Sequence, residues 1–318
     1  MNSTKQTALV DTSRLIIQKG SKSFAAAAKI FDGETRDNAY MLYAWCRHCD
    51  DVIDNQELGF DSKPQDPAVT QRILDELKAK TQAAIDDIPS DEPVFEGLRY
   101  VLKRNEIPGR YPLELLDGFA MDATSHHYKD FGDTLQYCYY VAGVVGIMMA
   151  YVMGTRDEAA LQRATDLGLA FQLTNISRDV REDAEVGRIY LPADWLAEAG
   201  IPAKEILLPK HAGALAGVVK RLLDEADRYY QSANEGLRAL PFRSAWAVAA
   251  AREVYRAIGV KVRERGADAW QERVIVRKRR KLLGLAEGML DAAKASLFEK
   301  HTQPAPRDQD LWTAPSVH

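Results

Sequence analysis

Apolar residues recur along most of this chain at the spacing of a helix. In 69–85 they form one stripe among Arg, Glu, Lys and Gln, and in 216–230 they recur at i, i+3, i+4, i+7 and i+11. Both patterns predict amphipathic helices. The sequence has no convincing run of alternating β-branched residues and no Asn-Gly hairpin turn, so we expect an all-α fold.

An uncharged segment, 137–154, interrupts this amphipathic pattern. Its 18 residues are the lower limit for a membrane-spanning helix. Because no basic flank marks a cytoplasmic side, we interpret it as a fully buried central helix. Gly143 and Gly146 would let a neighbouring helix, or a long apolar ligand, approach closely, and such a helix also suits the wall of a deep apolar pocket.

Composition limits the setting. With 318 residues, 46% apolar and 28% charged, the chain has the composition of a soluble protein with one large core. A net charge of −4 argues against nucleic acid as a partner. No apolar stretch near the start resembles a signal peptide, and three cysteines cannot all pair, so we expect a cytoplasmic protein. We expect an N-terminal extension over 1–19, one main domain over 20–300 and a disordered, proline-containing tail over 301–318.

The first acidic cluster consists of Asp50, Asp51 and Asp54, at the end of an apolar helix predicted over 40–54. Asp50 and Asp54 would share one helix face, about 6 Å apart along the axis. The helix dipole disfavours anions at this end, and a bound cation would offset that cost. On its own the motif fits a solvated acidic helix end equally well.

The second acidic cluster consists of Asp179 and Asp183, which continue a polar stripe begun by Gln172 and Asn175 at i, i+3, i+7 and i+11. Two such faces turned toward each other would form a cage of oxygen ligands. Mg²⁺ suits this cage because it takes one or two carboxylates and fills its other positions with water and substrate phosphate. The alternative is that this segment is a surface helix stabilised by i,i+4 ion pairs. That alternative does not explain why both clusters have two carboxylates four residues apart.

Several basic residues are candidates for phosphate binding. Arg178, Arg181 and Arg188 alternate with the second cluster. Segment 20–24 offers hydroxyls and a lysine at a helix start, although a plain Ser N-cap explains it too. Segment 261–281 carries nine basic and three acidic residues. It fits a solvated basic helix face, or diphosphate capture by its inner residues with attraction to anionic lipid by its outer ones.

The cysteines and histidines of this sequence give no strong indication of a metal or catalytic site. We interpret Cys46 and Cys49 as buried helical thiols, because a zinc site would need a second ligand pair and only Cys138 remains. His126 and His127 lack metal-ligating companions and fit a loop. The absence of HExxH, GxSxG and GxGxxG argues against zincins, α/β-hydrolases and dinucleotide-binding folds.

Five motifs in order, 42–54, 137–146, 170–183, 187–192 and 243–262, resemble the squalene/phytoene synthase family. The resemblance extends from about residue 20 to residue 280 and implies an all-α, single-domain isoprenoid (terpenoid) synthase bundle around a central cavity. It implies that Asp50 and Asp54 form one metal-binding pair, and that Asn175, Asp179 and Asp183 form the other. Residues implied to contact diphosphate or line the cavity are Ser21, Ser23, Tyr43, Arg47, Arg178, Arg188, Tyr190 and Tyr255, and we add Gln172 from the polar stripe. Tyr137 is implied to assist catalysis.

The resemblance also implies a reaction. Two molecules of geranylgeranyl diphosphate would join head to head, with Mg²⁺ or Mn²⁺ and without NADPH, through a cyclopropyl diphosphate to phytoene. Stimulation by ATP is implied only by some bacterial relatives, and the chain has no Walker A signature. Peripheral contact with the inner membrane and with other carotenoid-pathway enzymes is also compatible with it. The alternatives are a farnesyl diphosphate-using dehydrosqualene or squalene synthase, and a non-catalytic assembly factor, although such relatives have typically lost acidic residues.

The paired spacing yields a test. We expect that four single substitutions each abolish turnover while the helical fold survives: Asp50→Ala, Asp54→Ala, Asp179→Ala and Asp183→Ala. The measurements are product formation at saturating Mg²⁺ and helical content. Near-normal product from two of these variants would refute the metal cage.

Overall fold

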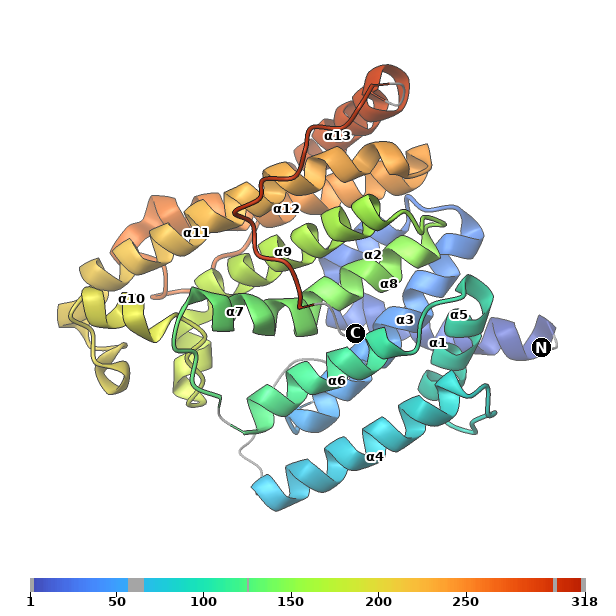
Figure 1. Ribbon diagram of the computed structural model, residues 1–318, viewed down its shortest axis with the longest axis horizontal. Helices are drawn as coiled ribbons and strands as arrows, with labels where there is room; N and C mark the ends of the chain where they lie inside the picture. The colour runs from blue at the N-terminus through green and yellow to red at the C-terminus, as the bar shows by residue number, and fades with distance from the viewer. Residues whose placement is uncertain (1–2, 57–65, 125, 300–301, 316–318) are drawn as a thin grey trace.

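The computed structural model describes residues 3–56, 66–124, 126–299 and 302–315, which contain helices and no strand. The α-helices are α1 (Ser3–Gly20), α2 (Lys22–Ala28), α3 (Gly33–Ile53), α4 (Pro67–Ile85), α5 (Pro93–Asn105), α6 (Arg110–Ala123), α7 (Phe131–Cys138), α8 (Val144–Val152), α9 (Glu158–Glu185), α10 (Ala193–Glu198), α11 (Ala212–Asn234), α12 (Phe242–Arg265) and α13 (Lys278–Lys294). Figure 1 shows them arranged as one bundle. The all-α prediction is confirmed.

Both amphipathic stripes form helices where the sequence predicts them. The stripe in 69–85 lies on α4, where Leu74, Leu77 and Ala84 are buried. Helix α4 begins at Pro67, after the Asp66 side chain caps it by accepting the N–H of Ala68. The stripe in 216–230 lies on α11, which buries it against α9.

The uncharged segment forms a nearly continuous helix from α7 through a π-helical turn, η1 (Tyr139–Gly143), into α8. Over Phe131–Val152 its mean hydropathy is 1.4, the one described helix apolar and long enough to cross a membrane by length and composition. Of that window 56% is buried inside the bundle, so the segment is a core helix but is not buried throughout, contrary to the prediction from the sequence. The π turn was not predicted, because hydrophobic spacing does not reveal a single wide turn.

Glycines allow α8 and the turn before it to touch α9. A Cβ at Gly146 would lie 2.4 Å from the carbonyl oxygen of Ala164, and one at Gly168 would lie 2.4 Å from that of Ala142. Neither contact could accommodate a side chain. The close approach expected at Gly146 is therefore made by a neighbouring helix, and α9 is held at the centre of the bundle (Figure 1).

The core has two large halves, besides a small third cluster in which alanines of α12 and α13 meet. One gathers around α3, α5, α6 and α8 and includes Trp45 and Leu116, whereas the other gathers around α9 and α11 and includes Leu173 and Leu222. Tyr139 and its neighbours in the π turn pack against both halves. The two acidic clusters thus belong to different halves, since α3 carries the first and α9 the second.

The predicted disorder of the tail is wrong for residues 302–315. Arg307 Nη2 lies 2.7 Å from Asp166 Oδ1, and Asp166 is completely buried. Leu311 is buried, and the Trp312 ring lies 5.8 Å from the Tyr139 ring. Figure 1 shows this segment returning across α12 and α9. Composition indicates disorder but cannot reveal that one arginine pairs with a carboxylate far away in the sequence.

The other domain boundaries stay predictions. Helix α1, which lies within the predicted N-terminal extension, packs against α3 and α5 and buries Leu9, Val10 and Ile17. Its contacts show no structural break at residue 19.

Arg307→Gln should destabilise the fold, because it leaves the Asp166 carboxylate buried without its cation. We expect the free energy of unfolding to fall by about 3–5 kcal/mol. Urea denaturation measures it. The matched control is Asp308→Asn, which breaks an exposed pair with Arg228 (2.8 Å) and should cost less than about 1 kcal/mol. Equal losses of unfolding free energy from the two variants would contradict the view that the Arg307–Asp166 pair anchors the tail to the bundle.

Candidate active site

The first acidic cluster lies at the C-terminal end of α3, where Asp54 is the C-cap residue. Arg47 Nη1 lies 2.6 Å from Asp50 Oδ2, and Gln56 Nε2 donates to the same oxygen at 3.1 Å. Burial raises the pKa of Asp50 to about 7; Arg47 opposes the shift, while Asp54 and Asp51 add to it. One arginine therefore does not balance the negative charge at this helix end.

The second acidic cluster lies at a kink in α9. Asp179 has φ −103° and ψ 17°, so the polar stripe changes direction there instead of running straight as the sequence predicts. Asp179 accepts hydrogen bonds from Arg178 Nε (2.7 Å) and Arg273 Nε (3.0 Å). Burial raises its pKa, but these arginines outweigh burial and hold the pKa below its usual value. Asp183 is different: burial, then Asp179 and Asp122, raise its pKa to about 8.

Arg188 and Asp122 join the two clusters. The Arg188 guanidinium donates to both Asp54 oxygens, at 3.0 and 2.5 Å, across 134 residues of sequence. Burial raises the pKa of Asp122 to about 6, with Arg188 lowering it and Asp54 raising it. The pKa of Asp183 responds to Asp122 and Arg188 as well. Arg188, which binds Asp54 of the first cluster, thus lines the same small space as Asp183 of the second.

Two tyrosines bind Asp122 from α7 and from the loop after α9. Tyr137 Oη donates to Asp122 Oδ2 at 3.0 Å, and Tyr190 Oη donates to Oδ1 at 2.7 Å. Their rings stack, with centroids 4.7 Å apart. Burial raises the pKa of both phenols well above the usual value, so both keep their protons.

Four partly exposed aromatic side chains from α2, α3, α9 and α12 meet inside the bundle: Phe24, Tyr43, Phe171 and Tyr255. Phe171 and Tyr255 stack at 4.3 Å, and Phe24 lies 6.3 Å from Tyr43. Burial raises the pKa of Tyr255 to about 12; Arg178 of α9 lowers it, and Tyr43 of α3 raises it. The aromatic cluster therefore lies where α3 and α9 approach each other.

The start of α2 lies over this aromatic cluster. A Cβ at Gly20 would lie 2.7 Å from Tyr43 Oη. Ser21 caps α2, and its Oγ accepts the Phe24 N–H at 3.3 Å, so the plain N-cap interpretation is confirmed. Ser23 lies within α2. Phosphate binding at this helix start stays a prediction.

The donor set fits a divalent metal held jointly with substrate, rather than a closed all-protein cage. In the described ranges, no three His, Cys, Asp or Glu side chains lie close enough to hold one ion. Asn175 Nδ2 donates to Gln172 Oε1 at 3.3 Å, but Asn175 Oδ1 is buried without a partner. Mg²⁺ needs only one or two protein carboxylates when phosphate and water complete its shell. An orphaned amide oxygen and two carboxylates of raised pKa suit that arrangement.

Two residues of the site were missed or only loosely located by sequence reasoning. Asp122 has no carboxylate partner at helical spacing, so its sequence context gives no signal. Arg273 lies in the basic segment 261–281, whose inner residues were expected to capture diphosphate, and it pairs with Asp179. That segment is not one basic helix, because α12 ends at Arg265 and α13 begins at Lys278. Arg181, another phosphate candidate, instead donates to the Trp270 carbonyl at 2.7 Å.

The cysteines and histidines lie where the sequence predicts them, in a helix and in a loop, although Cys46 is partly exposed whereas Cys49 is fully buried. Cys46 and Cys49 lie in α3, and burial raises the thiol pKa of Cys46 to about 12 and that of Cys49 well above its usual value. His126 and His127 lie in a loop, where the His126 ring meets Tyr128 edge to face.

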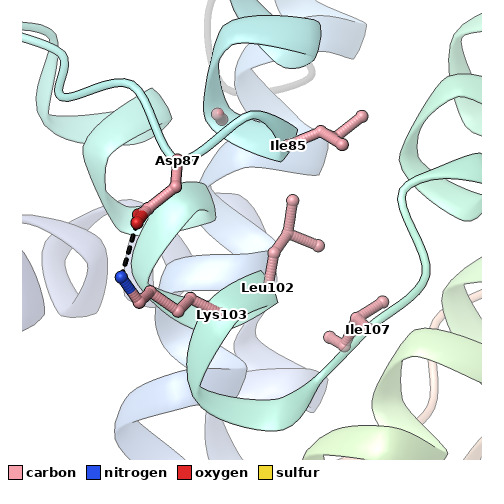
Figure 2. Close-up of a pocket in the computed structure, with 6 residues that line it drawn as sticks. Ile85, Asp87, Leu102, Lys103 and Ile107 are labelled. Carbon is pink, nitrogen blue, oxygen red and sulfur yellow. Dashed lines mark hydrogen bonds and ion pairs between the residues drawn. The ribbon is translucent and has the colours of Figure 1, made fainter.

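Neither described pocket is the deep chamber that the family resemblance implies. A pocket of about 220 Å³ lies near α4 and α5. Figure 2 shows its apolar side chains Ile85, Leu102 and Ile107 beside the Asp87–Lys103 ion pair, whose atoms are 2.5 Å apart. This pocket contains no predicted site residue. A space of about 10 Å³ lies beside Asp183 and Arg188, with room for about one water molecule. The chamber stays a prediction.

Comparisons with known proteins establish the family. The squalene/phytoene synthase profile matches residues 17–280. The chain is 48% identical to 15-cis-phytoene synthase from Enterobacter agglomerans, covering 94% of this chain and 100% of that protein. It is 47% identical to 15-cis-phytoene synthase from a Paracoccus strain, covering 96% and 98%. A solved dehydrosqualene synthase in complex with a ligand has a TM-score of 0.79 at 27% identity, covering 90% and 96%. The chain therefore belongs to the squalene/phytoene synthase family, as its motifs predict.

The raised pKa of Asp183 predicts a pH-dependent stability effect in EDTA. Its folded pKa of about 8 lies above the unfolded value of 3.8, so the charged carboxylate costs stability above pH 8. That cost fades as the pH falls through 8 toward 4. Asp183→Asn should therefore add about 1–3 kcal/mol of unfolding free energy at pH 9 and clearly less at pH 5. Urea denaturation at both pH values measures it. Glu185→Gln, at an exposed carboxylate, is the control and should show no such difference; an equal gain at both pH values for Asp183→Asn would contradict the burial of its charge.

Proposed function

We propose that this protein is a phytoene synthase, which condenses two molecules of geranylgeranyl diphosphate head to head in the first committed step of carotenoid biosynthesis. The observation that carries the proposal is the convergence of two acidic clusters from opposite core halves on one site, through Arg188 and Asp122. High identity to 15-cis-phytoene synthases over nearly the whole chain supports this substrate and product.

We propose Mg²⁺ or Mn²⁺ as the cofactor, with protein ligands drawn from Asp50, Asp54, Asn175, Asp179 and Asp183. When bound, the ion neutralises charge on the diphosphate leaving group. Arg47, Arg178 and Arg188 lie against these carboxylates, so the same guanidinium groups are placed to bind diphosphate oxygens. Gln172 orients Asn175 through their hydrogen bond.

The aromatic cluster has two tasks in this proposal. Its ring faces stabilise an allylic cation once the diphosphate leaves, because the negative face of an aromatic ring attracts positive charge. Its apolar surface also keeps water from the cation, which would otherwise be captured as an alcohol. Phe24, Tyr43 and Tyr255 contribute from separate helices, so the prenyl chain would be enclosed from several sides.

Tyr137 and Asp122 form a route for the final proton. Because its pKa is raised, Tyr137 keeps its own proton and can accept another only as it passes its own to Asp122, 3.0 Å away. The carboxyl of Asp122, with a pKa near 6, is suited to receive it. The diphosphate released in the reaction is the other candidate acceptor of this proton.

A farnesyl diphosphate-using dehydrosqualene synthase is the second candidate, because a solved protein of that name shares the fold at 27% identity. A non-catalytic assembly role is disfavoured by the two intact acidic clusters. We propose a cytoplasmic location with peripheral contact to the inner membrane and to other carotenoid-pathway enzymes. The net charge of −4 gives no reason to expect a nucleic-acid partner.

Incubation of the purified protein with geranylgeranyl diphosphate and Mg²⁺, without NADPH, tests the proposal. We expect phytoene in the extracted hydrocarbon fraction by chromatography, and none after EDTA treatment. Farnesyl diphosphate in a parallel incubation is the chain-length control. Product from farnesyl diphosphate alone would favour the second candidate, and a strict requirement for NADPH would favour a squalene synthase.

A further inference from the structure

Helix α13 packs tightly on α12 through one face of small residues. A Cβ at Gly288 would lie 2.5 Å from the backbone nitrogen of Ala250, and one at Gly284 would lie 3.3 Å from the Glu253 Cβ. Ala292 is completely buried on the same face. Figure 1 shows α13 at the edge of the bundle, and among the described α-helices α12 is the one that packs along it.

The opposite face of α13 is also apolar, and it is exposed. Its large side chains and their exposed fractions are Leu282 (65%), Leu283 (52%), Met289 (42%) and Leu290 (67%), followed by Leu297 (69%) in the turn η6 (Ala295–Glu299). At 100° per residue these positions fall within a sector of about 120°, and exposed Ala286 lies inside it. Isolated exposed apolar residues are ordinary, but a continuous stripe of this kind marks an interaction surface. We call it the α13 stripe.

Basic residues precede the α13 stripe. Arg277, Lys278 and Arg279 are exposed at the first turn of α13, where the helix dipole disfavours cations. Arg280, by contrast, turns inward to Glu287 (2.6 Å) and Glu253 (3.3 Å) and fastens the helix to its neighbour. The cost at the first turn is offset if an external anion meets the three outer residues.

We propose that the α13 stripe and Arg277–Arg279 form a docking surface for an anionic lipid bilayer. Helix α13 would lie in the plane of the interface, with the leucines at the acyl boundary and the basic residues among the headgroups. This inference deepens the proposed function, because a prenyl substrate and a hydrocarbon product both partition into lipid. It assigns the membrane contact to one element of the fold.

A second copy of this chain is a poorer occupant of the same surface. The exposed charged residues at the start of α13 are the basic Arg277, Lys278 and Arg279. Its acidic residues Glu287 and Asp291 already pair with Arg280 and Arg252. Two α13 helices packed together would bring the exposed Arg277–Arg279 of one copy against a helix whose Glu287 and Asp291 carboxylates are already in ion pairs. An anionic bilayer satisfies both the apolar stripe and its basic residues.

Vesicle flotation tests this surface without substrate, so failed docking would leave the condensation reaction untouched and the two proposals separable. The probes are vesicles of phosphatidylcholine alone and vesicles with added phosphatidylglycerol. We expect the full chain to bind the anionic vesicles, and the binding to weaken as salt is raised. Equal binding to both vesicle types, or no binding, would overturn the proposal.

Two variants assign the contact. Each basic residue near an anionic surface changes the partitioning of a protein onto the membrane about fivefold. The triple variant Arg277→Gln/Lys278→Gln/Arg279→Gln should therefore weaken binding to the anionic vesicles on the order of 100-fold. Leu282→Ser/Leu283→Ser/Leu290→Ser should weaken it at least about tenfold. The control Leu15→Ser/Ile88→Ser/Leu208→Ser removes three exposed apolar side chains elsewhere and should bind normally.

Two further measurements keep the outcome decisive. Helical content and turnover in detergent micelles should match the unsubstituted protein in both α13 variants, because the changed side chains point away from the bundle. Vesicle binding that survives both α13 variants would overturn the assignment. A concentration-dependent dimer that the leucine variant dissociates, without vesicle binding by the unsubstituted chain, would assign the stripe to a second copy instead.

Discussion

The ion pair between Arg188 and Asp54 is the constraint on which the site depends. It connects the loop after α9 to the end of α3, and these helices belong to different halves of the core. Apolar packing stabilises each half, but it does not place one acidic cluster opposite the other. The arginine does, because its planar guanidinium holds both carboxylate oxygens at once and so fixes direction as well as distance.

The same region carries more negative charge than its arginines neutralise. Asp50 and Asp183 have raised pKa values, whereas Asp179, with two arginines, has a lowered one. A protein that only had to fold would gain from replacing the first two. Their retention is understandable if a cation joins the site together with an anionic substrate, since divalent charge then offsets the repulsion.

The sequence could predict those features of the fold and the site that depend on the spacing of neighbouring residues. Helical periods located α4 and α11, and the four-residue repeats located both acidic clusters. It could not locate Asp122, a lone carboxylate whose importance comes from Tyr137, Tyr190 and Arg188 meeting it in space. The kink at Asp179 and the π turn before α8 also escaped prediction, because each is a local departure from a period that otherwise continues. The tail was misjudged for a related reason, since one long-range ion pair outweighs a composition typical of disorder.

The pairing of Arg307 with Asp166 spans 141 residues and fastens the first half of α9. Contacts this distant form late during folding, because the intervening chain must be ordered before its ends can meet. Until then the Asp166 carboxylate, which also accepts a hydrogen bond from Ser232, lacks the guanidinium that neutralises it in the finished fold. The Arg188–Asp54 pair, across 134 residues, carries a similar loop-closure cost, so the two ion pairs that fix the ends of α9 are both among the most non-local contacts of the fold.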